Sequence, residues 1–414
     1  MTWPAPLRSL ANRSLRLFFA GQAVSLAGTW MQQVAQGWLI WRLTGSAELL
    51  GLVGFLGQLP VSLFGVWAGS LADRYPRRRL VLLTQANAIV QATLLATVTL
   101  LGVVQPWHVV VLGAMLGLTY AFEIPARQAL LADVAGDEMP NAIALNASIV
   151  NGARAIGPAL AGWLVATIGE GWCFLLNAAS FGGTFYALWV MPSPPQAPSR
   201  AGQGAHLLEG LRWAWRTPHA RALLLLIATC SFFAMPYATL LPVVAAEVLH
   251  GDARLFGWLQ AAAGVGAFAG AVRLLLRRGL GGLLGRVALG ATLLGLGVLG
   301  LGLSTSVPLS LAALAVTGFG FITQMAGTMT LLQGLCPREL RGRVMGLFST
   351  LFVGVTPFGA LAFGVVGHRA GVRATLGAGA VVALIAVTAF WWSQARLRRA
   401  IAEAHPHLAG DELP

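Results

Sequence analysis

The sequence predicts an all-α membrane protein with twelve transmembrane helices, arranged as two pseudo-symmetric halves of six. Hydrophobic residues make up 57% of the 414 residues and charged residues only 10%, a balance that water-soluble domains of this length do not tolerate. The chain contains about a dozen successive stretches of roughly 20 or more mostly apolar residues, the length that crosses a bilayer as a helix. Because membrane segments must satisfy their own backbone hydrogen bonds, helices are the expected spanning element.

The twelve predicted spans follow these apolar runs in order. The first six cover 15–41, 48–72, 80–102, 107–131, 141–168 and 172–191, and the last six cover 220–248, 255–276, 283–303, 308–332, 343–367 and 373–394. The longest internal polar stretch, 192–219, separates them. We therefore expect an N-terminal half at 1–191, a cytoplasmic linker at 192–219, a C-terminal half at 220–395 and a cytoplasmic tail at 396–414.

The two halves resemble each other weakly at an offset of about 200 residues. The segment Thr44-Gly45-Ser46-Ala47-Glu48 precedes span 2, and His250-Gly251-Asp252-Ala253-Arg254 precedes span 8 at the corresponding place. Pro158 in span 5 similarly corresponds to Pro357 in span 11. Two repeated halves around a site near the middle of the bilayer are a known transporter plan.

The arginines predict the orientation of the chain. Twelve spans place both termini on one side, and the great majority of the 27 basic residues, including Arg127, then fall in gaps on that side. Arg42, Arg254, Arg369 and Arg373 fall on the other side, and Arg154 lies within a span. By the positive-inside rule the termini are cytoplasmic. The net charge of +13 is thereby explained by contact with anionic lipid, and no nucleic-acid partner is expected.

Composition also limits the chemistry. The chain contains no lysine, so it has no phosphate-binding Gly-x-x-x-x-Gly-Lys loop and no lysine Schiff base. The seven histidines and three cysteines show no metal-ligand or triad spacing. We therefore expect no enzyme activity, no catalytic residues, no metal and no cofactor, and we expect a monomer.

The gap after span 2 carries the most specific motif. It runs Gly69-Ser70-Leu71-Ala72-Asp73-Arg74-Tyr75-Pro76-Arg77-Arg78-Arg79. An acid at a helix end followed by arginines is suited to a chargeable latch, although the arginines alone also fit an ordinary cytoplasmic loop. This segment resembles the signature loop of the major facilitator superfamily. The resemblance implies that Gly69, Asp73, Arg74, Arg77 and Arg78 form a cytoplasmic gate that locks the two halves together. Pro76 stands where that family usually has glycine.

Span 5 carries a second motif, with Gly152, Gly157, Pro158 and Gly162 at helical spacing. Small residues let a neighbouring helix approach closely, and proline frees a backbone carbonyl; plain helix packing is the alternative. The spacing is similar to the span-5 motif of drug:proton antiporters in the superfamily. The run Phe122-Glu123-Ile124-Pro125-Ala126-Arg127 also resembles the subgroup of bacterial exporters that includes the enterobactin exporter. These resemblances imply export from a bacterium across its inner membrane.

Glu123 and Arg154 are the candidates for proton coupling. Glu123 lies about 16 residues past Trp107, or roughly 24 Å along span 4, and an ionisable residue at such depth is costly and often functional. Arg154 lies about 13 residues into the neighbouring span 5 and is expected to pair with Glu123, so that a proton on Glu123 would free it for an anionic cargo. A static ion pair is the alternative. Asp133 and Glu170 lie at span ends, where we expect them to be solvated.

Polar residues within the spans are candidates for lining a substrate cavity, because the resembling family lines its cavity with spans 1, 2, 4, 5, 7, 8, 10 and 11. Hydrogen bonding within the protein core is the alternative for each of them. The candidates are Gln32, Gln36, Gln58, Asn151, Tyr237, Gln260 and Gln324.

The sequence thus favours a secondary active transporter that exports an amphipathic small molecule, drug-like or siderophore, by proton antiport with alternating access. The expected partners are the small-molecule substrate, protons and the lipid bilayer. One alternative is a lysophospholipid or metabolite transporter of the same fold, which an inward substrate flux would reveal. The other is a non-transporting sensor or scaffold, which would show no flux.

Overall fold

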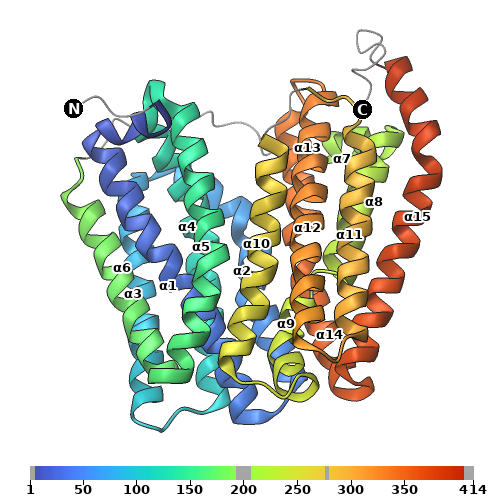
Figure 1. Ribbon diagram of the computed structural model, residues 1–414. Helices are drawn as coiled ribbons and strands as arrows, with labels where there is room; N and C mark the ends of the chain where they lie inside the picture. Colours follow the sequence, from blue (N-terminus) through green and yellow to red (C-terminus); the bar gives the residue numbers. More distant parts are fainter. Residues whose placement is uncertain (1–4, 193–206, 276–278, 405–414) are drawn as a thin grey trace. The chain divides into compact units, whose positions relative to one another are not determined.

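Helices form every regular element in the described part of the chain, which comprises residues 5–192, 207–275 and 279–404 of a computed structural model (Figure 1). Short 3-10 helices, Ala5–Ala11 and Gly136–Glu138, precede α1 and α5. The helices before the linker are α1 (Arg13–Thr44), α2 (Ala47–Arg74), α3 (Arg77–Leu100), α4 (Pro106–Ala135), α5 (Met139–Ile168) and α6 (Glu170–Val190).

The helices after the linker are more interrupted. They are α7 (Leu207–Arg216), α8 (Pro218–Phe233), α9 (Tyr237–Val243), α10 (Ala253–Leu275), α11 (Leu283–Leu303), α12 (Val307–Leu335), α13 (Arg341–Val353), α14 (Thr356–Ala370) and α15 (Val372–Ala404), with a short π-helix, Val244–Val248, after α9. Part of the expected linker is therefore the helix α7. The expected seventh and eleventh spans are each broken, before Tyr237 and before Thr356. Pro236 and Pro357 lie at these breaks, and neither can donate a backbone hydrogen bond.

The described residues form two compact units. Unit 1 lies within Met1–Ala201 and Gly251–Ala261, and unit 2 within Gly202–His250 and Ala262–Pro414. The first turns of α10 thus group with unit 1, although the whole of that helix is expected from the sequence in the C-terminal half.

Ten candidate membrane spans are found in the described residues by length and apolarity. One of them, Pro106–Ile168, is 63 residues long and contains both α4 and α5, while α1 is not among the ten. The chain is therefore a multi-pass membrane protein. The count of twelve spans stays a prediction.

The helix starts that the sequence paired across the two halves have matching caps. Ser46 precedes α2, and its hydroxyl accepts a hydrogen bond from the backbone nitrogen of Leu49 at 3.3 Å. Asp252 precedes α10, and its carboxylate accepts from the backbone nitrogens of Arg254 and Leu255 at 3.0 and 3.3 Å. Each side chain satisfies amide groups that the helix itself cannot pair. Both segments therefore cap the start of a helix.

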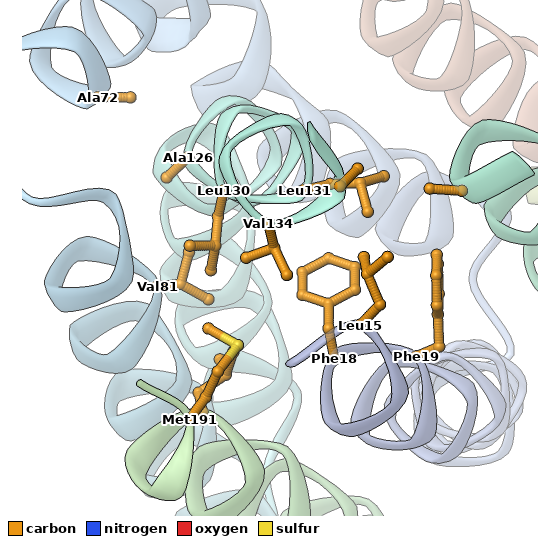
Figure 2. Close-up of a cluster of buried hydrophobic side chains, with 13 residues drawn as sticks. Leu15, Phe18, Phe19, Ala72, Val81, Ala126, Leu130, Leu131, Val134 and Met191 are labelled. Carbon is orange, nitrogen blue, oxygen red and sulfur yellow. The ribbon is translucent and has the colours of Figure 1, made fainter. Parts of the chain in front are cut away.

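An apolar cluster joins one end of α1, α3, α4 and α6 in unit 1. Leu15 and Phe18 of α1, Val81 of α3, Leu130 of α4 and Met191 just after α6 are all buried within it (Figure 2). Burial of such side chains from water, together with their close packing, holds these helix ends together. The cluster lies in the same stretch of α4 as Asp133, and it includes the part of α3 that follows the candidate gate motif.

Helices α2 and α4 approach closely at a pair of glycines. A Cβ atom added to Gly117 of α4 would lie 2.2 Å from the carbonyl oxygen of Gly57 in α2, closer than any real contact. Unit 2 repeats this arrangement, because a Cβ on Gly318 of α12 would lie 1.9 Å from the carbonyl oxygen of Ala263 in α10. Small residues permit such backbone contact between membrane helices.

Gly117→Ala is expected to lower the stability of the folded protein by about 1–3 kcal/mol, the usual cost of overpacking. The thermal unfolding midpoint of the purified protein in detergent measures this loss. Gly183→Ala in α6 is the matched control, since its Cβ meets nothing within 4 Å and alanine favours a helix. An unfolding midpoint for Gly117→Ala equal to that of the wild type would contradict the close approach.

Candidate functional site

Glu123 lies inside α4 and is only 3% exposed. Pro125 is also inside this helix, where it lacks the amide hydrogen that would complete the regular bonding. The carboxyl group therefore lies in a buried stretch of a membrane helix whose backbone bonding is locally interrupted. Such a position is costly for an acid and is a candidate for function.

The two carboxylate oxygens of Glu123 have different surroundings. Oε1 forms an ion pair with Arg127, one helical turn further along α4, and accepts a hydrogen bond from Nε2 of Gln85 in α3 at 2.8 Å. Oε2 is buried and has no hydrogen-bond partner within the described part of the chain. One oxygen is thus held by two donors, while the other is left for a further hydrogen bond or a proton.

The pairing expected from the sequence is therefore wrong in its basic partner, because Arg127 rather than Arg154 forms the ion pair with Glu123. Arg127 had been assigned to a cytoplasmic gap, but α4 continues to Ala135 and includes it. The four-residue spacing of Glu123 and Arg127 places them as neighbours on one helix face, a signal that the sequence already contained. Gln85 could not have been found in this way, because it comes from another helix.

Arg154 of α5 lies over an aromatic ring of α1. Its guanidinium carbon is 5.5 Å from the centre of the Trp30 ring, a cation–π arrangement. Gly157, from the span-5 motif, lies against the same residue, since an added Cβ there would be 2.7 Å from the Cβ of Trp30. The motif thus brings α5 close to α1 at the point where Arg154 is held.

Further along the motif, Gly162 provides a close backbone approach between α5 and the start of α10. A Cβ at Gly162 would lie 2.6 Å from the carbonyl oxygen of Ala253 and 2.8 Å from the Cα of Gly257. A Cβ at Gly152 would meet nothing within 4 Å in the described part of the chain. Two of the motif glycines therefore have a packing role that alanine could not fill.

The arginines of the candidate gate motif that begin α3 make their contacts within unit 1. Arg77 forms an ion pair with Asp133 near the end of α4, with side chains 10% and 3% exposed. Arg78 donates to the backbone oxygens of Leu188 and Trp189 at the end of α6, at 2.7 and 2.5 Å. Cationic side chains at a helix C-terminus bind carbonyls that the helix leaves unpaired. The start of α3 is therefore tied to α4 and to the end of α6.

The expectation that Asp133 is solvated is wrong, because its carboxylate is buried against Arg77. The burial of Asp133 could not be predicted from the sequence, because a position near a span end does not reveal a partner from another helix. Of the other residues in this motif, Arg74 is exposed, and Gly69 has no neighbour from the described part of the chain within 4 Å of an added Cβ. Asp73 belongs to α2, and its side chain lies outside the described part of the structure.

A third ion pair joins the last turn of α1 to the start of α6. Arg42 donates from two nitrogens to the two oxygens of Glu170, at 2.7 and 3.3 Å. Glu170 is only 8% exposed, so the expectation that it is solvated is also wrong. The pair borders a cavity of about 260 Å³ that Trp38 and Asp252 also line.

Two of the candidate cavity residues are bonded within the core of unit 1. Gln32 donates to Gln91 at 3.0 Å and accepts from Asn177 at 2.6 Å, which joins α1 to α3 and α6. Gln36 donates to the backbone oxygen of Val109 in α4 at 3.4 Å. Gln32 and Gln36 thus make the hydrogen bonds within the protein core that were the alternative to lining a cavity.

The other candidates differ in exposure. Gln58 is exposed, Gln260 is half-buried, and Asn151 donates to the backbone of its own helix at 2.8 Å. Tyr237 is 8% exposed and Gln324 is fully buried. A role for these five in binding cargo stays a prediction.

A helical multi-pass fold with a buried acid in α4 and arginines at the start of α3 is typical of membrane transporters. The family model described as transmembrane secretion effector, a major facilitator model, matches residues 2–411. The chain therefore belongs to this family of major facilitator transporters.

Bacterial transporters align with most of the chain. It is 24% identical to the staphyloferrin A transporter of Staphylococcus aureus, over 94% of this chain and 98% of that protein. It is 25% identical to the multidrug efflux pump Tap of Mycolicibacterium fortuitum (84% and 88%). It is 29% identical to the enterobactin exporter EntS of Citrobacter koseri (79% and 77%). The resemblance to efflux pumps and to the enterobactin exporter subgroup is confirmed.

A solved structure shows the same fold. The crystal structure of a mutant of the nucleoside transporter NupG superposes with a TM-score of 0.73, covering 92% of this chain and 100% of that one, at 14% identity. At this level of identity the match concerns the fold alone. It supports the helical architecture expected from the apolar runs.

Proposed function

We propose that this chain exports an amphipathic small molecule, drug-like or siderophore, across the bacterial cytoplasmic membrane in exchange for protons. The observation that carries the proposal is the buried carboxyl group of Glu123. One of its oxygens is held by Arg127 and Gln85, and the other has no hydrogen-bond partner among the described residues. A carboxyl group in such a place can exist in two protonation states whose contacts differ. An exchanger driven by protons requires such a group.

Protonation of Glu123 changes the electrostatics of α4. When ionised, the carboxylate neutralises Arg127, whose side chain is 17% exposed. When protonated, it leaves that guanidinium without its counter-charge, which is costly in a membrane interior. The arginine is then released to another anion or to a rearranged helix. This change couples proton uptake to a second conformational state, whereas a static ion pair would only fix the two side chains.

Arg154 supplies a second cation in unit 1, and its site against Trp30 combines a positive charge with an aromatic surface. An amphipathic cargo has the matching features, an apolar body and a polar or anionic group. The relatives are named for such cargoes: multidrug efflux, a staphyloferrin and enterobactin. Their names support a drug-like or siderophore cargo for this chain.

We further propose twelve transmembrane helices in two halves, with both termini in the cytoplasm, working as a monomer by alternating access. Rocking of one half against the other around a central site is the mechanism typical of this plan. The excess of arginines on the side of the termini supports the orientation.

The function is tested by flux in proteoliposomes that contain the purified protein, with an imposed pH gradient. The panel contains a lipophilic cation dye, a catecholate siderophore and a lysophospholipid. Movement of the dye or the siderophore in the export direction, dependent on the gradient, is the expected result. Transport of the lysophospholipid alone, or of no compound by folded protein, would overturn the proposal.

Asp73→Asn is expected to slow turnover several-fold without abolishing transport, because the gate loses a charge but keeps Arg77 and Arg78 in place. Initial rates of export at saturating cargo measure this effect. Asp137→Asn is the control, since Asp137 is an exposed acid after α4. Equal turnover in wild type and Asp73→Asn would remove Asp73 from the gate.

A further inference from the structure

A groove of about 270 Å³ runs between α8 and α15 in unit 2. Four residues of α8 from Ala222 to Thr229 line one wall, and four residues of α15 from Ala386 to Ser393 line the other. The two helices pack against each other and run in opposite directions (Figure 1). On each helix the lining residues recur at the spacing of a single helix face. The groove therefore follows both helix axes for about two turns.

The walls of this groove are apolar to an incoming molecule. The hydroxyl of Thr229 donates to the backbone oxygen of Leu225 at 2.9 Å, and that of Ser393 donates to the backbone oxygen of Phe390 at 2.8 Å. The remaining lining residues are alanine, leucine and phenylalanine. Leu225 is 49% exposed, and both helices belong to candidate membrane spans. A hydrocarbon chain can bind in such an apolar, membrane-facing groove without leaving a polar group unpaired.

At one end of the groove, an exposed arginine lies next to the lining residues on each of the two helices. Arg221 lies four residues before Leu225 on α8, and Arg396 lies three residues after Ser393 on α15, so each arginine is the next neighbour of a lining residue on its helix face. Because the helices are antiparallel, the start of α8 and the late part of α15 meet at one end. Two guanidinium groups therefore flank the end of an apolar groove.

The surroundings of this end are those of a membrane interface. Trp215 of α7 is 60% exposed, and its ring centre is 5.9 Å from the guanidinium carbon of Arg221. Trp392 of α15 is 84% exposed. Tryptophan is enriched where headgroups meet the hydrocarbon core. The acid of α7, Glu209, is paired with Arg343, so it does not neutralise the arginine of α8.

We propose that this groove is a binding site for an anionic phospholipid, with an acyl chain between α8 and α15 and the phosphate between Arg221 and Arg396. Guanidinium groups bind phosphate oxygens through paired hydrogen bonds. Basic residues next to a membrane span favour anionic over zwitterionic lipid. With the orientation proposed from the arginines, the site lies in the cytoplasmic leaflet. It is separate from Glu123, and its occupancy does not depend on which cargo the protein moves.

Native mass spectrometry of the purified protein, titrated with phosphatidylglycerol or with phosphatidylcholine of the same chains, tests the site. Each arginine near an anionic membrane surface strengthens binding about fivefold, so R221Q/R396Q is expected to lose roughly 30-fold in affinity for phosphatidylglycerol and little for phosphatidylcholine. R13Q/R16Q is the matched control, because Arg13 and Arg16 are exposed arginines at the start of α1. It is expected to bind like the wild type.

A second variant tests the groove itself. A389F places a bulky ring among the lining residues and keeps both arginines, and it is expected to reduce the bound phosphatidylglycerol as strongly as the double arginine variant does. Unchanged binding in both R221Q/R396Q and A389F would overturn the site. Equal losses in R13Q/R16Q and R221Q/R396Q would also overturn it, because they would indicate a diffuse charge effect.

Discussion

Glu123→Gln is expected to abolish transport driven by a pH gradient while leaving the protein folded. Glutamine keeps the size of the side chain and a carbonyl oxygen that accepts from Gln85, but it cannot take up and release a proton. The amide also fixes the uncharged state, so Arg127 is permanently without its ion-pair partner. Initial rates of export in proteoliposomes, with and without an imposed gradient, measure the loss. We expect gradient-dependent export to fall to the level of protein-free vesicles.

The matched control is Glu48→Gln, which removes an exposed glutamate at the start of α2 and is expected to transport normally. Monodisperse elution and a cooperative thermal transition distinguish loss of coupling from loss of fold. If the Glu123→Gln variant still exports cargo in response to the gradient, Glu123 has no part in coupling, and a static ion pair is favoured.

Asp133→Asn is expected to produce the largest loss of stability among the gate variants, about 3–5 kcal/mol. This is the usual cost of removing one partner from a buried ion pair. The side chain of Asp133 is 3% exposed and that of Arg77 is 10% exposed, so little water replaces the missing charge. The same pair ties the start of α3, within the candidate gate motif, to α4, and its loss is therefore expected to slow transport as well. The unfolding midpoint in detergent and the export rate measure the two effects.

Two controls separate the buried charge from other causes. Asp137→Asn removes a nearby exposed acid and is expected to leave stability unchanged. The double variant R77Q/D133N removes both charges, and it is expected to recover much of the loss because no unpaired charge remains buried. A midpoint for Asp133→Asn within the error of the wild type would show that the pair contributes nothing to the fold.

The sequence predicted the helices well because membrane helices are determined by local composition. Apolar length located most of the spans, and the charged segment from Asp73 to Arg79 located the loop between α2 and α3. The breaks before Tyr237 and Thr356 were not predicted as helix ends, although the prolines that mark them are visible in the chain. An apolar run continues through such a break without any change in hydropathy.

The site was predicted less completely because its contacts join different helices. Glu123 stood out as an acid deep in an apolar segment, but its partner Gln85 comes from α3 and could not be inferred from spacing. Asp133 was placed in water for the same reason, since Arg77 approaches it from another helix. Gln32 appeared suited to a cavity, yet it bonds to Gln91 and Asn177. A polar residue in an apolar helix indicates that a partner exists without identifying it.

Proton antiport is tested most directly by measuring the proton flow that accompanies cargo movement. Proteoliposomes loaded with a transported cargo are diluted into cargo-free buffer at equal pH on both sides, and a pH-sensitive dye outside follows protons. Alkalinisation of the outer buffer that depends on cargo and is absent in Glu123→Gln is the result that proton antiport predicts. Cargo movement by the wild-type protein with no change in pH would contradict it.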